Sequence, residues 1–264
     1  MPEGPEVTIV KYFIKGLIEG HKLISIYTEN RKKYNLDILR SNMTIENIFN
    51  KGKCIFIKLT DQYGSLYIYN HLNMTGKWIT DTNSNHIKLS ITTDKTTIYF
   101  DDVRSFGKFE VMSEQNYNNK INQIGPDLLN EIVSWEQYYA IYKQATTRSN
   151  MDVAKFLLEQ KYLSGIGNYL KSEILYNSRI NPSLGIKELN DTQIYTLYYI
   201  SIYMIRYAYQ CGGMTIQDFV NPFSNGNGGF KPYVYNQPYD PCGNKVVKIT
   251  QSTRTTHWVP VIQH

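Results

Sequence analysis

The first six residues of the chain bring together groups that could carry out covalent chemistry. An initiator methionine is normally removed before a residue as small as Pro2, so the mature chain would begin with a secondary amine. An α-amine has a pKa of about 7.7 to 8.0, so an appreciable fraction is unprotonated near neutral pH. This amine could attack C1′ of a sugar to form an iminium, and Glu3 could give a proton to the ring oxygen. The alternative is that MPEGPEV is simply the capped start of a helix.

Composition limits the other kinds of chemistry. The three cysteines, Cys54, Cys211 and Cys242, form no CxxC pair, and the N-terminus has no signal-peptide pattern. We therefore expect an intracellular protein, nuclear or cytoplasmic and not secreted. Of the 264 residues 42% are apolar and 19% charged, and no apolar run is long enough to span a membrane. The net charge of +5 is compatible with an anionic partner.

One helix and a set of strands follow the N-terminal residues. Apolar residues recur at three- and four-residue steps from Val7 to Ile18, which predicts a helix that starts near Pro5 and ends near Gly20. Between residues 23 and 111, short β-branched or aromatic segments alternate with turn residues. These segments predict a β-sandwich or barrel.

The second half of the chain is predicted to be largely helical. Helical periodicity runs from about residue 129 to residue 210, with breaks at SGIGN, INPSLG and CGGM. A Gly/Asn-rich loop and a β-hairpin, KVVKIT against RTTHWVPV, complete the chain. We therefore predict an α+β protein of two domains. The expected segments are a helix plus β-sandwich domain over 1–125, a linker and helix over 126–150, a helical domain over 151–220, and a loop with the hairpin over 221–264.

Several motifs, in this order along the chain, resemble one family of DNA-repair enzymes. They are MPEGPEV, GKC at 52–54, HLNMTG at 71–76, VRSFGKF at 103–109, SGIGNYLKSEILYNSRINP at 164–182 and RTTHWVP at 254–260. Together they resemble the formamidopyrimidine-DNA glycosylase and endonuclease VIII family. PEGPEV, in place of PELPEV, is similar to the endonuclease VIII branch. The resemblance implies that residues 151–220 form a helix-two-turns-helix domain.

The resemblance implies roles for the residues of the reaction. Pro2 would be the Schiff-base nucleophile and Glu3 the general acid, with Glu6 and Glu173 supporting the site. Lys53 would contact the phosphate beside the lesion and aid β-elimination, although without the resemblance an ordinary surface lysine would be the favoured interpretation. Glu173 suits a capping or ion-pair role at least as well.

The resemblance also implies contacts with DNA. Met74, Arg104 and Phe106 match the residues that fill the gap left by a flipped nucleotide, although Met74 alone would suit a core. Glycines before a helix let its amides approach a phosphate, as SGIGN would. The other implied DNA-binding residues are His71, His86, Arg104, Lys155 and Asn168. A lone histidine beside a strand is otherwise more often structural.

The C-terminal hairpin departs from the family pattern, which usually has a four-cysteine zinc finger. Alignment on Arg254 puts Tyr239, Cys242, Val259 and Ile262 at the four ligand positions. One thiolate cannot build a tetrahedral zinc site, so we expect no metal and a zincless finger packed by apolar residues. Arg254 remains at the turn, where it would assist at a phosphate, although a solvated basic hairpin has the same composition.

These inferences predict a bifunctional DNA glycosylase and AP lyase. It would bind duplex DNA with oxidised bases or abasic sites in a groove between the domains and remove oxidised pyrimidines. A Schiff base at Pro2 would lead to β- and δ-elimination. We expect a monomer with no cofactor and no membrane partner. Two alternatives remain: a preference for 8-oxoguanine or formamidopyrimidines, set by loop 221–232, or a module that binds damaged DNA without cutting it.

Overall fold

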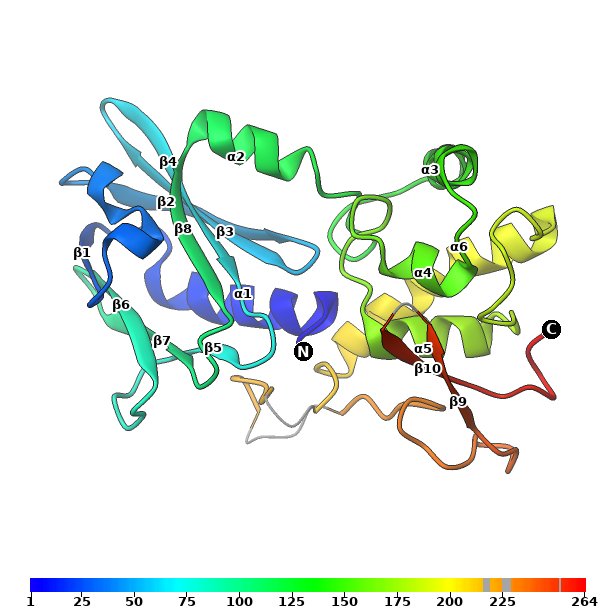
Figure 1. Ribbon diagram of the computed structural model, residues 1–264. Helices are drawn as coiled ribbons and strands as arrows, with labels where there is room; N and C mark the ends of the chain where they lie inside the picture. The colour runs from blue at the N-terminus through cyan, green and yellow to red at the C-terminus, as the bar shows by residue number, and fades with distance from the viewer. Residues whose placement is uncertain (216–218, 225–228, 252) are drawn as a thin grey trace. The chain divides into compact units, whose positions relative to one another are not determined.

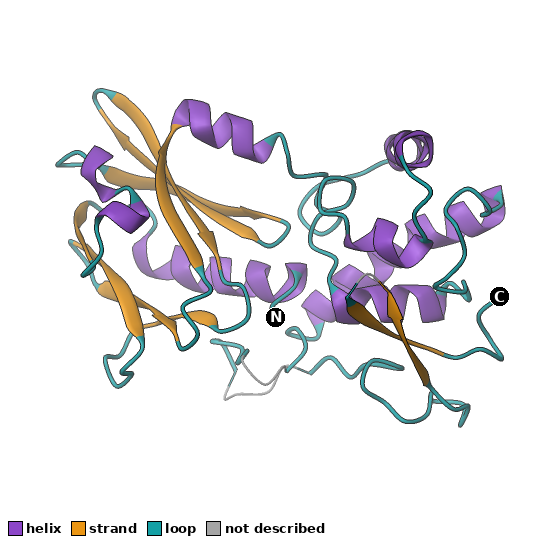
Figure 2. Ribbon diagram, viewed as in Figure 1, coloured by secondary structure: helices purple, strands orange, loops and turns teal. Residues whose placement is uncertain are grey.

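The computed structural model describes residues 1–215, 219–224, 229–251 and 253–264. The chain forms two compact units (Figure 1). The first unit comprises residues 1–2, 6–123 and 215–228, and the second comprises residues 3–5, 124–214 and 229–264. The α+β class is confirmed, because strands dominate the first unit and helices the second (Figure 2). Residues 225–228, within the predicted lesion loop, lie outside the described residues.

The described part of the first unit contains a long helix and two four-stranded antiparallel sheets. Helix α1 spans Gly4–Ile18. One sheet has the order β1-β6-β7-β5 and the other the order β2-β3-β4-β8. The strands are β1 (Leu23–Tyr27), β2 (Thr44–Lys51), β3 (Cys54–Asp61), β4 (Gly64–His71), β5 (Gly76–Ile79), β6 (Ile87–Thr93), β7 (Thr97–Asp102) and β8 (Lys108–Ser113). Short 3₁₀ turns lie at Lys32–Tyr34 and Leu36–Ile38.

Burial explains why the strand segments fold as they do. Strand β3 is central in its sheet, and Ile55, Phe56, Ile57 and Leu59 are all fully buried. A strand segment covered on both faces is expected to be apolar, and Ile55–Ile57 is such a run, whereas Lys58 is only partly buried and pairs with Glu46. This packing fixes the start of β3 at Cys54. It thereby fixes the turn that carries Lys53.

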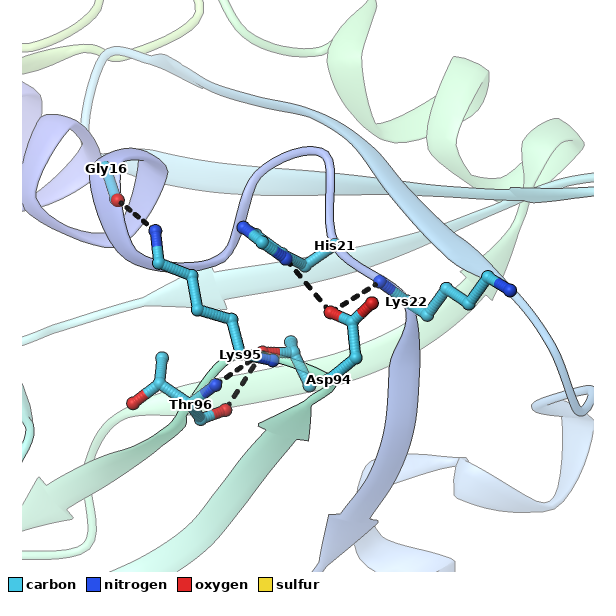
Figure 3. Close-up of polar contacts among 7 residues, drawn as sticks. Gly16, His21, Lys22, Asp94, Lys95 and Thr96 are labelled. Carbon is cyan, nitrogen blue, oxygen red and sulfur yellow. Dashed lines mark hydrogen bonds and ion pairs between the residues drawn. The ribbon is translucent and has the colours of Figure 1, made fainter.

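A small polar cluster joins the end of α1 to the β6–β7 hairpin (Figure 3). Asp94 Oδ1 lies 2.9 Å from His21 Nδ1 and accepts a hydrogen bond from Lys22 N at 3.2 Å. Lys95 Nζ donates to Gly16 O at 3.5 Å. The cluster therefore holds the C-terminal end of α1 against the sheet.

The second unit is built from four described helices and a two-stranded ribbon. The helices are α3 (Trp135–Arg148), α4 (Val153–Leu158), α5 (Asn168–Asn177) and α6 (Asp191–Gln210), and the ribbon pairs β9 (Val247–Gln251) with β10 (Arg254–Trp258). Capping boxes at Ser134 and Asn190 start α3 and α6. Strand β10 packs beside α5 (Figure 1).

Helix α5 is unusual because it buries polar residues in succession. Lys171, Ser172 and Glu173 have no exposed surface, in a helix that is buried from Tyr169 to Leu175. A charged side chain is almost never fully buried unless it has partners. These residues are therefore expected to have hydrogen-bonding partners within the protein.

Helix α2 (Glu114–Ile121) was not predicted from the sequence. Its residues are polar and none is buried, so no apolar periodicity marks it. The helix forms because Ser113 Oγ accepts a hydrogen bond from Asn116 N at 3.3 Å and because Tyr117 stacks on Tyr67, with ring centroids 3.9 Å apart. In the described ranges, every helix is too short or too polar to cross a bilayer.

Candidate active site

The Glu3 side chain is the best-defined part of the candidate site. It is 3% exposed, and its carboxylate accepts hydrogen bonds from three backbone N–H groups. Oε2 accepts from Gly167 N at 2.7 Å and from Leu170 N at 3.2 Å, and Oε1 accepts from Tyr169 N at 2.9 Å. These groups form the N-terminus of α5, whose own N-cap residue, Gly167, supplies no side-chain cap. Glu3 therefore caps a helix that lies more than 160 residues away along the chain.

The glycines of SGIGN allow this approach. A Cβ at Gly167 would overlap the Glu3 carboxylate, and Gly165 has φ +94°. Gly4 N donates to Gly165 O at 2.8 Å, and a Cβ at Gly4 would lie 3.1 Å from Gly165 Cα. Pro2 is buried and directly precedes this anchored segment.

Lys53 lies in a cationic cluster of the first unit. It is 7% exposed, in the turn between β2 and β3, and the neighbouring Cys54 pairs in register with His71 at the end of β4. Burial, together with the charges of Lys53, Lys108 and Lys120, lowers the pKa of His71 to about 4. Neutral His71 accepts a hydrogen bond from Asn73 N on Nδ1 at 3.0 Å. Lys108 and Lys120 were not among the predicted residues, because nothing in the sequence places them beside Lys53.

The three predicted gap-filling residues lie on two loops that share one buried carboxylate. Asp102 accepts hydrogen bonds from Thr75 Oγ1 and from Gly107 N, the latter at 2.6 Å. Asn73 Nδ2 also donates to Phe106 O across the loops. The loops present Met74, 38% exposed, and Phe106, 57% exposed, to solvent, and Arg104 Nη1 lies 3.8 Å from Met74 Sδ.

A cavity of about 680 Å³ adjoins these loops in the first unit. Its lining includes Phe13 of α1, Trp78 of β5 and Arg104. A cavity of this size is in the range that holds small ligands. His86 is not among the residues that line this cavity. It is exposed, and its backbone N–H donates a hydrogen bond to Ser84 Oγ at 3.1 Å.

The second unit brings Lys155 and Arg254 to one small cavity. The cavity has a volume of about 190 Å³ and is also lined by Glu159, Gln251 and Lys171. Lys171 was missed by the sequence analysis, because a lysine in a helix is usually on its exposed face. Asn168 is the first residue of α5, and its Oδ1 accepts a hydrogen bond from Lys171 Nζ at 2.9 Å.

Glu173 has a different position from the other predicted residues. Its carboxylate accepts N–H groups from Tyr233 at 2.8 Å, Val234 at 3.0 Å and Tyr235 at 2.8 Å. Burial raises the pKa of Glu173, and the three hydrogen bonds oppose that rise. The side chain therefore holds the segment before the hairpin against α5. Glu6, on α1, is fully buried.

The residues at the base of the hairpin do not suit a zinc ion. Val259 has no exposed surface and packs with Val234 and Val246, and Ile262 packs against this cluster. Tyr239 is 60% exposed and Cys242 is an exposed free thiol. Across the described residues, no group of three or more His, Cys, Asp or Glu could hold a metal ion.

We therefore expect chelation to leave the protein unchanged. Incubation with a strong chelator should shift neither the thermal unfolding midpoint nor the DNA-nicking rate, because the hairpin base is closed by apolar side chains. Elemental analysis of the purified protein should find well under one zinc ion per chain. Stoichiometric zinc, or unfolding on chelation, would contradict the assignment.

His257 on β10 is a buried histidine of the hairpin. It is 3% exposed, and among the described residues neither ring nitrogen has a hydrogen-bond partner. The ring packs edge-on against Tyr235, with centroids 4.9 Å apart. Burial, with the charges of Lys248 and Lys171, lowers the pKa of His257 to about 4.

Because folding requires neutral His257, stability should fall as pH drops below the unfolded-state pKa of about 6.5, and the loss should continue to about pH 4. We expect His257→Phe to remove about 2 kcal/mol of the loss in unfolding free energy between pH 7 and pH 5. Urea titrations at both pH values measure this change. His71 contributes a similar dependence in the first unit, so the variant should flatten the pH profile without abolishing it. An unchanged slope would contradict the prediction.

Comparison with known proteins identifies the family. Three family models match consecutive parts of the chain: the formamidopyrimidine-DNA glycosylase N-terminal domain over residues 1–109, the H2TH domain over 124–220 and the C-terminal domain over 224–264. The chain belongs to the formamidopyrimidine-DNA glycosylase family. It is thus a DNA N-glycosylase with lyase activity at abasic sites. The family resemblance inferred from the motifs is confirmed.

Similar proteins match over the full length. Formamidopyrimidine-DNA glycosylase of Enterococcus faecalis is 28% identical over 281 residues, covering 100% of this chain and 97% of the relative. The Oceanobacillus iheyensis enzyme is 29% identical, covering 100% and 98%. Lactococcus lactis Fpg in complex with DNA containing an abasic site has a TM-score of 0.86 at 25% identity, with 99% of each chain covered. MutM in complex with DNA containing carbocyclic 8-oxo-G has a TM-score of 0.85 at 25% identity.

Proposed function

We propose that the chain removes oxidised pyrimidines from duplex DNA and nicks the strand at the resulting abasic site, with Pro2 as the nucleophile. One observation carries the proposal: three backbone N–H groups hold Glu3 at the N-terminus of α5. Glu3 directly follows the reactive amine, so anchoring Glu3 limits where that amine can lie. Positioning of this kind contributes much of the rate of a covalent reaction.

The proposed reaction begins with the Pro2 amine attacking C1′ of the damaged nucleotide while the base leaves with the electrons of the glycosidic bond. The backbone N–H groups that donate to Glu3 favour its charged carboxylate form. Glu3 would therefore first accept the proton released by the attacking amine. Glu3 would then give this proton to the sugar ring oxygen as the ring opens to an iminium. Loss of a C2′ proton expels the 3′-phosphate, and loss of a C4′ proton expels the 5′-phosphate.

Cations of both units would bind the phosphates of the DNA. In the first unit, the positive charges of Lys53, Lys108 and Lys120 all act on His71, and a group of cations of this kind suits a phosphate. In the second unit, Lys155 and Arg254 share a cavity. Arg254 is exposed at the start of β10, where it would assist the eliminations.

The first unit would receive the altered nucleotide. Met74, Arg104 and Phe106 would enter the gap in the helix, because Asp102 already orders the two loops that carry them. The neighbouring cavity of about 680 Å³ is large enough for a base. Part of its lining comes from Phe219, Val220 and Pro222, next to or within the predicted lesion loop.

Two substrate preferences have support. The resemblance of PEGPEV, in place of PELPEV, to the endonuclease VIII branch favours oxidised pyrimidines; the distinguishing residue, Gly4, packs closely against Gly165. The names of the similar proteins favour formamidopyrimidines, and one structural neighbour contains an 8-oxoguanine analogue. Single-turnover cleavage of matched duplexes containing 5-hydroxyuracil, 8-oxoguanine or a formamidopyrimidine decides between them. Faster cleavage of either purine lesion would overturn the pyrimidine preference.

Borohydride trapping tests the covalent step. Reduction of the iminium with abasic-site DNA should give a stable adduct, and peptide mass spectrometry should place it on Pro2. A form with a permanent extra residue before Pro2 has no free amine there and should give no adduct. An adduct on a lysine, or undiminished trapping by the blocked form, would overturn the assignment of Pro2.

A further inference from the structure

Lys171 is a buried cation that the proposed reaction does not use. It lies in the middle of α5 with no exposed surface. Its Nζ donates to Asn168 Oδ1 at 2.9 Å and to Thr255 O, at a longer 3.4 Å. The two partners belong to the two elements that carry the predicted phosphate ligands of this unit, the start of α5 and the hairpin.

The contact with Asn168 fixes which way its amide points. A lysine ammonium has three donors and no acceptor, so the Asn168 atom that faces it must be the oxygen. The Asn168 NH₂ group is therefore turned away from Lys171. Asn168 is half-buried, so this group remains available to an anionic ligand.

The contact with Thr255 holds the hairpin beside α5. Thr255 follows Arg254 directly, so a bond to its carbonyl oxygen restrains the backbone that carries the guanidinium. Nearby bonds support the same placement: Ser172 Oγ accepts His257 N at 3.3 Å, and Gln251 Nε2 donates to Asp152 Oδ2 at 3.2 Å. The hairpin has no set of metal donors among the described residues, so contacts such as these must position its turn.

We propose that Lys171 is a positioning residue for phosphate binding: its ammonium orients the Asn168 amide and restrains the backbone at Arg254, so that both donors face one phosphate. The inference rests on the proposed function. With no exposed surface, Lys171 is poorly placed to act as a second nucleophile at C1′.

The charged groups around Lys171 change its pKa, so the proposed positioning of Asn168 depends on pH. Burial lowers the pKa of Lys171 to about 8, against the opposing effect of Glu3 and Asp152, and Arg254 lowers it further. Lys155 and Glu159 line the adjoining cavity. Above about pH 8, the amine loses its charge and its obligatory donor role toward Asn168.

The test compares Lys171→Met, Lys171→Arg and the matched control Lys187→Met, which removes an exposed lysine of the same unit. The binding probe is a duplex with a tetrahydrofuran abasic-site analogue, followed by fluorescence anisotropy. We expect Lys171→Met to weaken binding at least about tenfold, equivalent to about 1.4 kcal/mol, because two donors lose their orientation. Lys171→Arg should bind within about threefold of wild type, since the adjoining cavity of about 190 Å³ has room for a guanidinium. Lys187→Met should bind like wild type.

Three further readouts separate positioning from a general effect on folding. At saturating abasic-site DNA, Lys171→Met should lose less in trapping rate than it loses in affinity, because the substitution leaves the Pro2 amine unchanged. In an Asn168→Ala background, Lys171→Met should weaken DNA binding by a smaller factor than it does alone. Wild-type binding should weaken as pH rises through about 8, whereas Lys171→Arg binding should not.

Wild-type affinity in a folded Lys171→Met variant, or full additivity with Asn168→Ala, would overturn the inference. If Lys171→Met does not fold, the pH comparison between wild type and Lys171→Arg decides, and parallel profiles overturn it. Failure of wild type to form any borohydride adduct would instead refute the proposed function, whatever the binding results.

Discussion

Gly167→Ala is expected to lower the single-turnover rate of base removal and strand nicking at least about 100-fold. The added methyl group would occupy the position of the Glu3 carboxylate, so Glu3 must leave its three N–H donors. The residue next to the Pro2 amine then loses its anchor. Displacement of a reacting group by about 1 Å can cost about 100-fold in rate. Quench-flow or manual quench assays on a lesion-containing duplex, with protein in excess, measure the effect.

Gly16→Ala is the matched control. Gly16 lies inside α1, and a Cβ there meets nothing within 4 Å. This substitution should leave the rate unchanged and stabilise the helix by about 0.5 to 1 kcal/mol. Wild-type rates for Gly167→Ala would show that the contact of Glu3 with α5 is unimportant for the reaction. Circular dichroism should show that both variants are folded.

Glu173→Ala is expected to be the most destabilising single change outside the apolar core. It leaves the N–H groups of Tyr233, Val234 and Tyr235 without their acceptor, and Val234 is fully buried. An unsatisfied buried donor costs about 1 to 3 kcal/mol, and release of the buried carboxylate offsets part of the total. We expect a net loss of about 3 kcal/mol in the unfolding free energy, measured by urea titration.

Glu173→Gln should give a smaller loss, because an amide oxygen in place of Oε1 can still accept from Val234 and Tyr235. Glu110→Ala, at an exposed glutamate, should change stability by less than about 0.5 kcal/mol. Equal stability of the alanine and glutamine variants would show that the carboxylate is not the anchor of residues 233–235. Loss of nicking with wild-type stability would instead indicate a direct part in the reaction.

The fold was accessible from the sequence where one face of an element is apolar. The stepwise pattern from Val7 to Ile18 predicted α1, which spans Gly4–Ile18, and RTTHW lies in β10 as predicted. Helix α2 was missed because a serine cap and a stacked tyrosine pair stabilise it, and neither leaves a periodic signal.

The candidate site was accessible only in part. The N-terminal motif drew attention to Pro2 and Glu3, because an amine beside an acid suggests a reaction. Lys171 left no such signal: in a helix, a run of polar residues ordinarily indicates the solvent face. Its burial depends on the packing of β10 and α4 against α5, contacts between segments that are far apart in the sequence. The cluster of Lys53, Lys108 and Lys120 was hidden for the same reason.

The apolar base of the hairpin also determines how the protein responds to oxidants. A zinc site held by thiolates fails when peroxide or hypochlorous acid oxidises its cysteines, because sulfenic and higher acids no longer hold the metal. Val234, Val246 and Val259 offer such reagents no reactive sulfur, and oxidation of the exposed Cys242 thiol would leave this apolar cluster in place. The same oxidants produce damaged bases, so the turn that carries Arg254 would remain in place under the conditions that generate the enzyme's substrates.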